Sequence, residues 1–276
     1  MTKPPPPTLP LRVAIGGLGA IGLPVAKRLD AGIDGLRLVA VSARDPGRAQ
    51  ARIAGFRDPV PVLPLGELAG HADVVVECAP AAVFAEVAES TVSAGRVLVT
   101  LSVGALLSRM DLVERARATG SRIIVPTGAL LGLDAVRAAA EGEIARVTLT
   151  TRKPPAGLKG APYLDRHGIA IDGLTAPLKV FEGSAREAAA GFPANVNVAA
   201  ALALAGIGPD RTTVELWADP TVTRNTHTIE VEADSTRFAM TIEGVPSPDN
   251  PRTGRLTPLS VIATLRRLTA VLQVGT

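Results

Sequence analysis

The stretch Arg12-Val13-Ala14-Ile15-Gly16-Gly17-Leu18-Gly19-Ala20-Ile21-Gly22 decides the fold of this chain. It begins as a short apolar run, typical of a buried parallel strand, and ends in the glycine spacing G-x-G-x-x-G. A helical pattern to about residue 29 and a second apolar strand over residues 36–41 follow. This order of strand, glycine turn, helix and strand predicts a site for the pyrophosphate of a dinucleotide.

Each residue of the turn has an expected task. Gly17 permits the tight turn, Gly19 lets the backbone approach the pyrophosphate, and Gly22 lets the helix pack on the strand. Ala20 and Ile21 lead into the helix, where unpaired backbone amides and the positive end of the helix dipole face the phosphates. We therefore expect these five residues to bind the cofactor.

The end of the second strand bears on the choice between NAD and NADP. NAD-binding versions of this unit place an Asp or Glu there, but this chain has Ser42-Ala43-Arg44-Asp45. The small hydroxyl of Ser42 followed by the guanidinium of Arg44 suits a 2′-phosphate, so the sequence favours NADP, with NAD also accepted. Two alternatives stay open: Asp45 turns towards the ribose and binds NAD, or Arg44 and Asp45 form only a solvated turn.

Composition excludes several classes of protein. The chain has 276 residues, of which 47% are hydrophobic and only 3% aromatic, so its core must be built from Ala, Val, Leu and Ile. The net charge of +3, with acids and bases interspersed, argues against a nucleic-acid-binding surface. The single cysteine, Cys78, excludes an internal disulfide, and no His/Cys/Asp cluster has metal-site spacing. Because no apolar run approaches the roughly 18 residues that cross a bilayer, we expect a cytoplasmic protein without membrane contact.

The first half continues to alternate strands with helices. Further apolar strands are expected at residues 73–77, 96–102 and 122–126. Ligands of open parallel sheets bind beyond the carboxyl ends of the strands. We therefore expect the nicotinamide half of the cofactor near the residues that follow these strands, namely Ala79, Pro80, Ser102 and Ala129. Turn formation alone would explain each of these residues equally well.

After about residue 130 the pattern changes. Strands expected at 147–152, 213–218, 226–233 and 236–243 follow one another as in a mixed or antiparallel sheet. We predict an α/β fold, a Rossmann-type doubly wound parallel sheet with a second α+β domain. The expected divisions are a disordered tail at 1–11, a dinucleotide-binding Rossmann domain at 12–130, an α+β substrate and catalytic domain at 131–254, and a C-terminal helix at 255–276 that packs back on the Rossmann domain.

Several motifs in the second half point to one family. They are, in order, Thr151-Arg152-Lys153-Pro154-Pro155, Phe181-Glu182-Gly183-Ser184-Ala185, Phe192-Pro193-Ala194-Asn195-Val196-Asn197-Val198-Ala199-Ala200, Asp219-Pro220, Asn225-Thr226-His227 and Pro248-Asp249-Asn250-Pro251-Arg252-Thr253. Together with the glycine turn, they resemble the L-aspartate dehydrogenase family over nearly the whole chain, from Arg12 to Leu268. Departures occur at Ser42-Ala43, where an acidic residue is common, and at Arg252 and Gly254, where Lys and Ser are usual.

The resemblance implies an activity, a cofactor and partners. Enzymes of that family oxidise L-aspartate to iminoaspartate with NAD or NADP, and the product hydrolyses to oxaloacetate and ammonia or feeds nicotinamide cofactor biosynthesis. By the same resemblance, His227 matches the catalytic histidine, and Ala129 and Asn197 match cofactor contacts. The expected partners are therefore the small molecules L-aspartate, oxaloacetate and ammonia, and we also expect a homo-oligomer, such as a homodimer.

His227 is the candidate catalytic residue. In its expected strand it shares a face with Ile229 and Val231, which by itself is more typical of a structural histidine. The neighbouring Asn225 and the family match reverse that preference, because amino-acid oxidation needs a group that exchanges protons near neutral pH. Our hypothesis is that hydride leaves the α-carbon for nicotinamide C4 and that His227 then activates a water to attack the imine.

A dicarboxylate substrate needs cationic and polar partners. We expect Lys153 first and Arg152 second, although both could simply end a strand in solvent. Arg252 and Thr253, with Asn250 nearby, form another candidate group, and Asn225 is added for its place beside the histidine. Asn197 could be a helix cap instead of a cofactor ligand.

Two alternative functions stay open. One is a related amino-acid-pathway reductase of the dihydrodipicolinate reductase or homoserine dehydrogenase type. The first of these usually has paired histidines with a downstream lysine, and no such pair is present here. The other is a non-catalytic NADPH-sensing protein, which would bind the cofactor without turning over any amino acid.

Overall fold

The computed structural model describes residues 10–193, 196–248, 250 and 253–275. It divides into two compact units, which are described separately. The first contains Met1–Ser102 (described from residue 10), Met110–Pro126 and Val261–Gln273, and the second contains Val103–Arg109, Thr127–Ser260 and Val274–Thr276 (described to residue 275). The predicted disordered tail therefore lies outside the described residues, except for residues 10 and 11.

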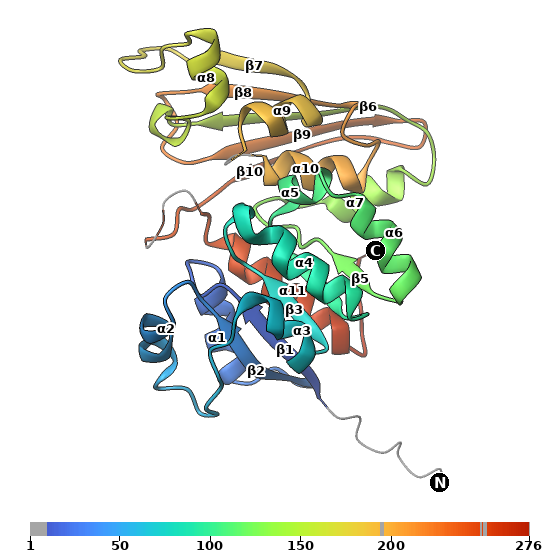
Figure 1. The fold of residues 1–276 in the computed structure, drawn as a ribbon. Coiled ribbons are helices and arrows are strands. Elements are labelled where there is room, and N and C mark those ends of the chain that lie inside the picture. The colour runs from blue at the N-terminus through green and yellow to red at the C-terminus, as the bar shows by residue number, and fades with distance from the viewer. Residues whose placement is uncertain (1–9, 194–195, 249, 251–252, 276) are drawn as a thin grey trace. The chain divides into compact units, whose positions relative to one another are not determined.

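The first unit is built on a parallel sheet (Figure 1). Its five strands have the order β2 (Leu36–Ser42), β1 (Leu11–Gly16), β3 (Val74–Glu77), β4 (Val97–Thr100) and β5 (Arg122–Ile124), and every neighbouring pair is parallel. The helical segments are α1 (Gly22–Asp30), α2 (Pro46–Ile53), η1 (Leu65–Glu67), α3 (Leu68–His71), η2 (Ala81–Val83), α4 (Phe84–Ser93), α6 (Asp111–Thr119) and most of α11 (Leu256–Thr269). This confirms the predicted Rossmann-type sheet.

The core of the first unit is aliphatic, as the composition predicts. Val13 and Ile15 on β1 pack with Val25 of α1, and all three side chains are fully buried. Val261 and Leu265 of α11 belong to the same core and are also fully buried. Each such side chain contributes on the order of 1.5–3 kcal/mol through burial.

The second unit contains a mixed sheet. Its order is β10 (Arg237–Glu243), β9 (Thr226–Ala233), β6 (Ile144–Lys153), β8 (Thr212–Ala218) and β7 (Leu178–Ser184). β6 and β8 are parallel, and the other neighbours are antiparallel. The helical segments are α5 (Val103–Leu107), α7 (Leu133–Ala139), η3 (Pro155–Gly157), α8 (Pro162–His167), α9 (Ala185–Gly191) and α10 (Asn197–Ala205), of which α9 and α10 pack against β7 and β8 (Figure 1). The predicted α+β character of this half is confirmed.

The boundaries differ in detail from the expected ones. β1 already begins at Leu11, whose pairing with Leu36 extends the sheet into the expected tail. Residues 103–109 group with the second unit instead of the first, because α5 packs on α10. The contact is close: a Cβ on Gly104 would lie 2.4 Å from Cγ1 of Val196.

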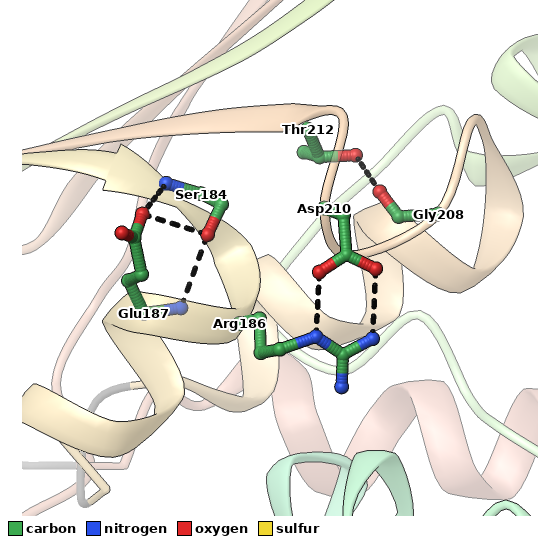
Figure 2. A network of polar contacts seen from close by, with 6 residues as sticks. All are labelled: Ser184, Arg186, Glu187, Gly208, Asp210 and Thr212. Atoms are coloured by element: carbon green, nitrogen blue, oxygen red, sulfur yellow. Dashed lines mark hydrogen bonds and ion pairs between the residues drawn. The ribbon is translucent and has the colours of Figure 1, made fainter.

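The corner between β7 and α9 is fixed by polar contacts (Figure 2). Ser184 caps α9 by accepting from the backbone N–H of Glu187, whose carboxylate accepts in return from the backbone N–H of Ser184, at 2.7 Å. Beside it the guanidinium of Arg186 binds both carboxylate oxygens of Asp210. This reciprocal capping satisfies donors that a helix start otherwise leaves unpaired.

No helix within the described ranges combines the length and apolar character that a membrane crossing requires.

Candidate active site

The glycine turn of the first unit has the geometry of a phosphate-binding loop. Gly17 has φ +104°, and a Cβ there would lie 2.7 Å from the carbonyl oxygen of Cys78. A Cβ on Gly22 would lie 1.8 Å from the carbonyl oxygen of Gly17, so both positions exclude larger residues. Gly19 differs, because a Cβ on this residue would meet nothing within 4 Å. The turn thus leaves open space above Gly19, as the approach of a pyrophosphate requires.

The start of α1 is suited to an anion. Its N-cap is Ile21, no side chain caps it, and its first turn contains no acidic residue. Backbone N–H groups at such a start are donors for a phosphate. Arg52 of α2 braces the loop by donating to the carbonyl oxygen of Leu18 at 2.5 Å.

The end of β2 shows what each polar residue there does. Ser42 is buried, and its carbonyl oxygen accepts from the N–H of Gly17 at 2.8 Å. Asp45 is the N-cap of α2, and its Oδ1 accepts from the backbone N–H of Arg48 at 2.9 Å. Arg44 is exposed. The carboxylate of Asp45 is therefore engaged by its own helix.

The end of β3 contains Glu77, a buried residue that the sequence reasoning missed. Cys78 follows β3 directly, and after it come Ala79, whose backbone N would lie 3.0 Å from a Cβ on Gly17, and Pro80. Ser102 follows β4, but its backbone N–H and its hydroxyl both donate to the carboxylate of Glu77, at 3.0 Å each. The signal in the sequence was Glu77 itself, a single acidic residue at the end of the apolar strand β3.

In the second unit, His227 lies in a buried polar cluster. It pairs across the sheet with Thr151 of β6, and Thr151 Oγ1 lies 3.0 Å from His227 Nδ1. Lys153 stands two residues after Thr151, so its side chain leaves the same face of the sheet. All three side chains are buried.

Burial changes the protonation of both cationic candidates. It lowers the pKa of His227 to about 3, and the nearby charge of Lys153 adds to this effect. Burial also lowers the pKa of Lys153 to about 8. At neutral pH the imidazole is therefore neutral and able to accept a proton, whereas most Lys153 side chains are charged.

Arg152 does not join this cluster. Adjacent strand residues point to opposite faces, so its side chain lies on the other side of the sheet from Lys153. There it binds Asp219 at 3.1 Å and stacks over the ring of Trp217, 4.4 Å from the ring centroid. Hydrogen bonds from Thr221 and Arg152 hold the pKa of Asp219 below its ordinary value. Arg152 and Lys153, both of which are candidates for binding the substrate, thus leave opposite faces of β6.

Two further predicted cofactor contacts belong to the second unit. Asn197 is the first residue of α10, whose N-cap is Val196, so it is not the helix cap. Its Oδ1 accepts from the backbone N–H of Gly104 at 3.0 Å, which leaves the amide group of Asn197 to present its N–H donors elsewhere. Ala129 follows Gly128, whose N–H donates to the hydroxyl of Ser260 at 3.1 Å.

The remaining substrate candidates are only partly brought together. Asn225 directly precedes β9, two residues before His227. Asn250 donates to the hydroxyl of Thr253 at 3.2 Å and accepts from its backbone N–H, so these two residues form one turn. Arg252 lies outside the described residues. Within the described part of the chain, no group of three or more His, Cys, Asp or Glu side chains could hold a metal ion.

Comparisons with known proteins decide the family. A family model described as "Aspartate dehydrogenase, C-terminal" matches residues 134–268, and one described as "Homoserine dehydrogenase, NAD binding domain" matches residues 17–126. An L-aspartate dehydrogenase of Bradyrhizobium diazoefficiens is 60% identical over 96% of this chain and 94% of that protein. L-aspartate dehydrogenase 3 of Bordetella bronchiseptica is 57% identical over 96% of this chain and 98% of that protein. The chain belongs to the L-aspartate dehydrogenase family.

Solved structures agree on the fold of this family. The aspartate dehydrogenase of Thermotoga maritima has a TM-score of 0.71 at 23% identity, covering 96% of this chain and 99% of that one. A homoserine dehydrogenase from Thiobacillus denitrificans has a TM-score of 0.61 at 15% identity, covering 94% of this chain and 73% of that one. At these identities the likeness concerns the fold only, and the family assignment comes from the sequence relatives.

Proposed function

We propose that this protein oxidises L-aspartate to iminoaspartate with a nicotinamide cofactor, and that the imine then hydrolyses to oxaloacetate and ammonia. The observation that supports this most directly is the buried cluster of His227, Thr151 and Lys153, in a chain that is 60% identical to an L-aspartate dehydrogenase. A buried imidazole beside a buried ammonium offers both a proton acceptor and a cation for an anionic substrate.

The first unit offers the residues that would hold the phosphates of the cofactor. The glycine turn and the uncapped start of α1 offer backbone N–H groups to its pyrophosphate. When bound, the nicotinamide ring supplies the acceptor for the hydride from the α-carbon of aspartate. Ala79, Pro80 and Ser102 follow the strands where a ligand of this sheet type binds, and Ala129 and Asn197 are the contacts implied by family resemblance.

We infer a preference for NADP over NAD. Asp45 is the acid that could have bound the adenosine ribose, and its carboxylate instead caps α2. Arg44 is exposed at the same strand end, next to Ser42, where a guanidinium can pair with a 2′-phosphate. These two observations support NADP without excluding turnover with NAD.

Each residue of the buried cluster has a proposed role. Lys153 binds a carboxylate of aspartate. The negative charge of that carboxylate would also favour the protonated forms of Lys153 and His227. Thr151 fixes the ring of His227 through Nδ1, so that Nε2 is the nitrogen that exchanges protons with the reacting water. His227 accepts one proton from that water as the water oxygen bonds to the imine carbon and the C=N π pair moves to the nitrogen, and returning that proton to the nitrogen lets it leave as ammonia while the C=O of oxaloacetate forms. Asn225, Asn250 and Thr253 are polar candidates for the second carboxylate, and Arg152 is a weaker one because it already binds Asp219.

The proposal is tested by following the reduction of NADP and of NAD with L-aspartate, homoserine and malate side by side. We expect turnover with L-aspartate alone, and a loss of at least about a hundredfold in kcat for His227→Ala. Turnover with homoserine instead would favour the related reductase. Tight cofactor binding without turnover of any substrate would favour the non-catalytic alternative.

Three further proposals accompany this function. They are a cytoplasmic location, a homo-oligomeric assembly such as a homodimer, and use of the iminoaspartate in nicotinamide cofactor biosynthesis. They are supported by the family membership, and light scattering of the purified protein tests the second of them.

A further inference from the structure

Glu77 is a buried carboxylate at the centre of the parallel sheet. It ends β3, the middle strand, and its side chain has 0% exposure. Oε2 accepts from the hydroxyl of Thr100 at 2.8 Å and from the backbone N–H groups of Leu101 at 3.2 Å and Ser102 at 3.0 Å. Oε1 accepts from the hydroxyl of Ser102 at 3.0 Å.

All four contacts make Glu77 the acceptor, and all four donors belong to one three-residue segment, residues 100–102. A buried charge is a weak source of stability, because desolvation offsets much of what its hydrogen bonds contribute. What such an arrangement does provide is a single defined shape for the segment that supplies the donors. Glu77 therefore determines how the chain leaves β4.

The position of Glu77 connects that segment to the glycine turn. In the sheet it pairs with Gly16 on one side and with Thr100 on the other. The next residue, Cys78, donates its backbone N–H to the carbonyl oxygen of Gly16 at 2.8 Å. Its own carbonyl oxygen is the atom that a Cβ on Gly17 would approach to 2.7 Å. The carboxylate of Glu77 thus lies between the phosphate-binding turn and the end of β4, at the carboxyl ends of the strands, where ligands of such sheets bind.

We propose that Glu77 is a positioning residue of the cofactor site, which holds residues 100–102 in the shape that the nicotinamide half of the cofactor requires. The inference rests on the proposed function only in that a nicotinamide cofactor binds this unit. It also assigns the donors of Ser102: both are engaged by Glu77, so Ser102 can offer a ligand only acceptor atoms.

The direct test is Glu77→Gln, with dissociation constants measured by calorimetry for NADP⁺ and NADPH. The amide of Gln can keep its oxygen at the Oε2 position, but its NH2 group then faces the hydroxyl of Ser102, which must turn to accept, and all the hydrogen bonds to residues 100–102 lose their charge assistance. We expect both forms of the cofactor to bind about tenfold more weakly. At saturating cofactor, kcat with L-aspartate should fall by a smaller factor than the cofactor affinity does, because the substitution loosens a binding segment and leaves the proton-exchanging residues in place.

A second variant allows the proposal to be tested even if the Glu77→Gln protein does not fold. Thr100→Val removes one donor to Oε2 while retaining the carboxylate and the side-chain shape, and we expect a smaller loss of affinity, about threefold. The matched control is Thr91→Val on α4, which also removes a fully buried hydroxyl, one that donates to the carbonyl oxygen of Val87 at 2.6 Å. The control should lose thermal stability without losing cofactor affinity.

Two results would overturn the inference. If Glu77→Gln and Thr100→Val lose thermal stability as Thr91→Val does, yet bind both cofactor forms as tightly as the unmodified protein, Glu77 is only structural. If the oxidised form alone binds more weakly, the charge of Glu77 matters and its positioning role does not. If the protein binds the cofactor but does not oxidise aspartate, the proposed function is contradicted. The role of Glu77 can still be tested in that case, because the dissociation constants do not depend on turnover.

Discussion

At the scale of single residues, the candidate site depends on burial. His227 could be proposed from the sequence because Asn225 stands two residues before it and because it matches the catalytic histidine of the family that the chain resembles. Its partner could not, because Thr151 stands 76 positions away and meets it only through the register of β6 and β9. The opposite placement of Arg152 and Lys153, in contrast, follows from strand alternation alone and was available from the sequence.

The protonation of His227 predicts how stability depends on pH. Its folded pKa of about 3 lies below the ordinary value of 6.5, so the unfolded chain binds the proton first as the pH falls. The stability contributed by the neutral ring is fully present above pH 6.5 and is lost progressively as the pH falls towards 3. Between pH 7 and pH 5 we expect a loss of about 2 kcal/mol.

Urea unfolding at pH 7 and pH 5 measures this loss. His227→Gln is the matched variant, because it keeps a polar side chain and removes the titrating ring. Between pH 7 and pH 5 its free energy of unfolding should fall by about 2 kcal/mol less than that of the unmodified protein. Equal losses in both proteins would contradict a neutral buried imidazole.

Arg44 provides the residue-scale prediction for the cofactor. Arg44→Ala should lower kcat/KM with NADP by about tenfold or more and leave NAD nearly unchanged, because only NADP has the 2′-phosphate for a charge-assisted hydrogen bond. Initial rates at several concentrations of each cofactor measure the effect. Arg28 is an exposed arginine in the last turn of α1, away from the glycine turn. The control variant Arg28→Ala removes the same charge and should change kcat/KM with neither cofactor. A parallel decrease with both cofactors would contradict the assignment.

At the scale of elements, the glycine turn separates two uses of glycine that a motif alone cannot distinguish. Gly22 is required by the fold itself, because its Cβ would strike the carbonyl oxygen of Gly17. A Cβ on Gly19 would meet nothing within 4 Å, so the fold tolerates a side chain there. If a pyrophosphate occupies the open space, the same methyl group would obstruct it.

This difference predicts opposite results for two alanine substitutions. Gly22→Ala should lower the thermal midpoint of unfolding, whereas Gly19→Ala should leave it close to the original and weaken cofactor binding by about tenfold or more. Gly70→Ala on α3 is the control, since its Cβ also meets nothing within 4 Å and it lies outside the turn. A Gly19→Ala protein with unchanged cofactor affinity would show that the phosphates bind elsewhere.

At the scale of the whole molecule, the chain passes repeatedly between its two units. It leaves the first unit after Ser102, returns at Met110, leaves again after Pro126 and returns at Val261. Hydrophobic periodicity depends on neighbours a few residues apart, and it predicted nine strands and the fold class but missed β7 (Leu178–Ser184), an edge strand of the second sheet. It could not predict that residues 103–109 belong with the second unit, because their partner is α10, and that contact depends on residues about 90 positions further along the chain.

This interleaving makes the last helix part of the cofactor-binding unit. Val261 and Leu265 are fully buried in the core that also contains Val13 and Ile15 of β1. Leu265→Ala would leave a cavity in this core, and we expect it to lower the free energy of unfolding by about 2–5 kcal/mol. Leu272→Ala, which alters a side chain of the same type that is 80% exposed, should change it by no more than about 0.5 kcal/mol.

Cofactor should offset part of this loss. A ligand that binds only the folded protein adds about 2.7 kcal/mol at a hundredfold excess over its dissociation constant. Chemical unfolding of Leu265→Ala with and without NADP, at a concentration set from its own dissociation constant, therefore measures whether the unit that contains α11 is the unit that binds the cofactor. A variant that is destabilised as expected but gains nothing from the cofactor would contradict that assignment, because burial of Leu265 and the glycine turn belong to one folded unit.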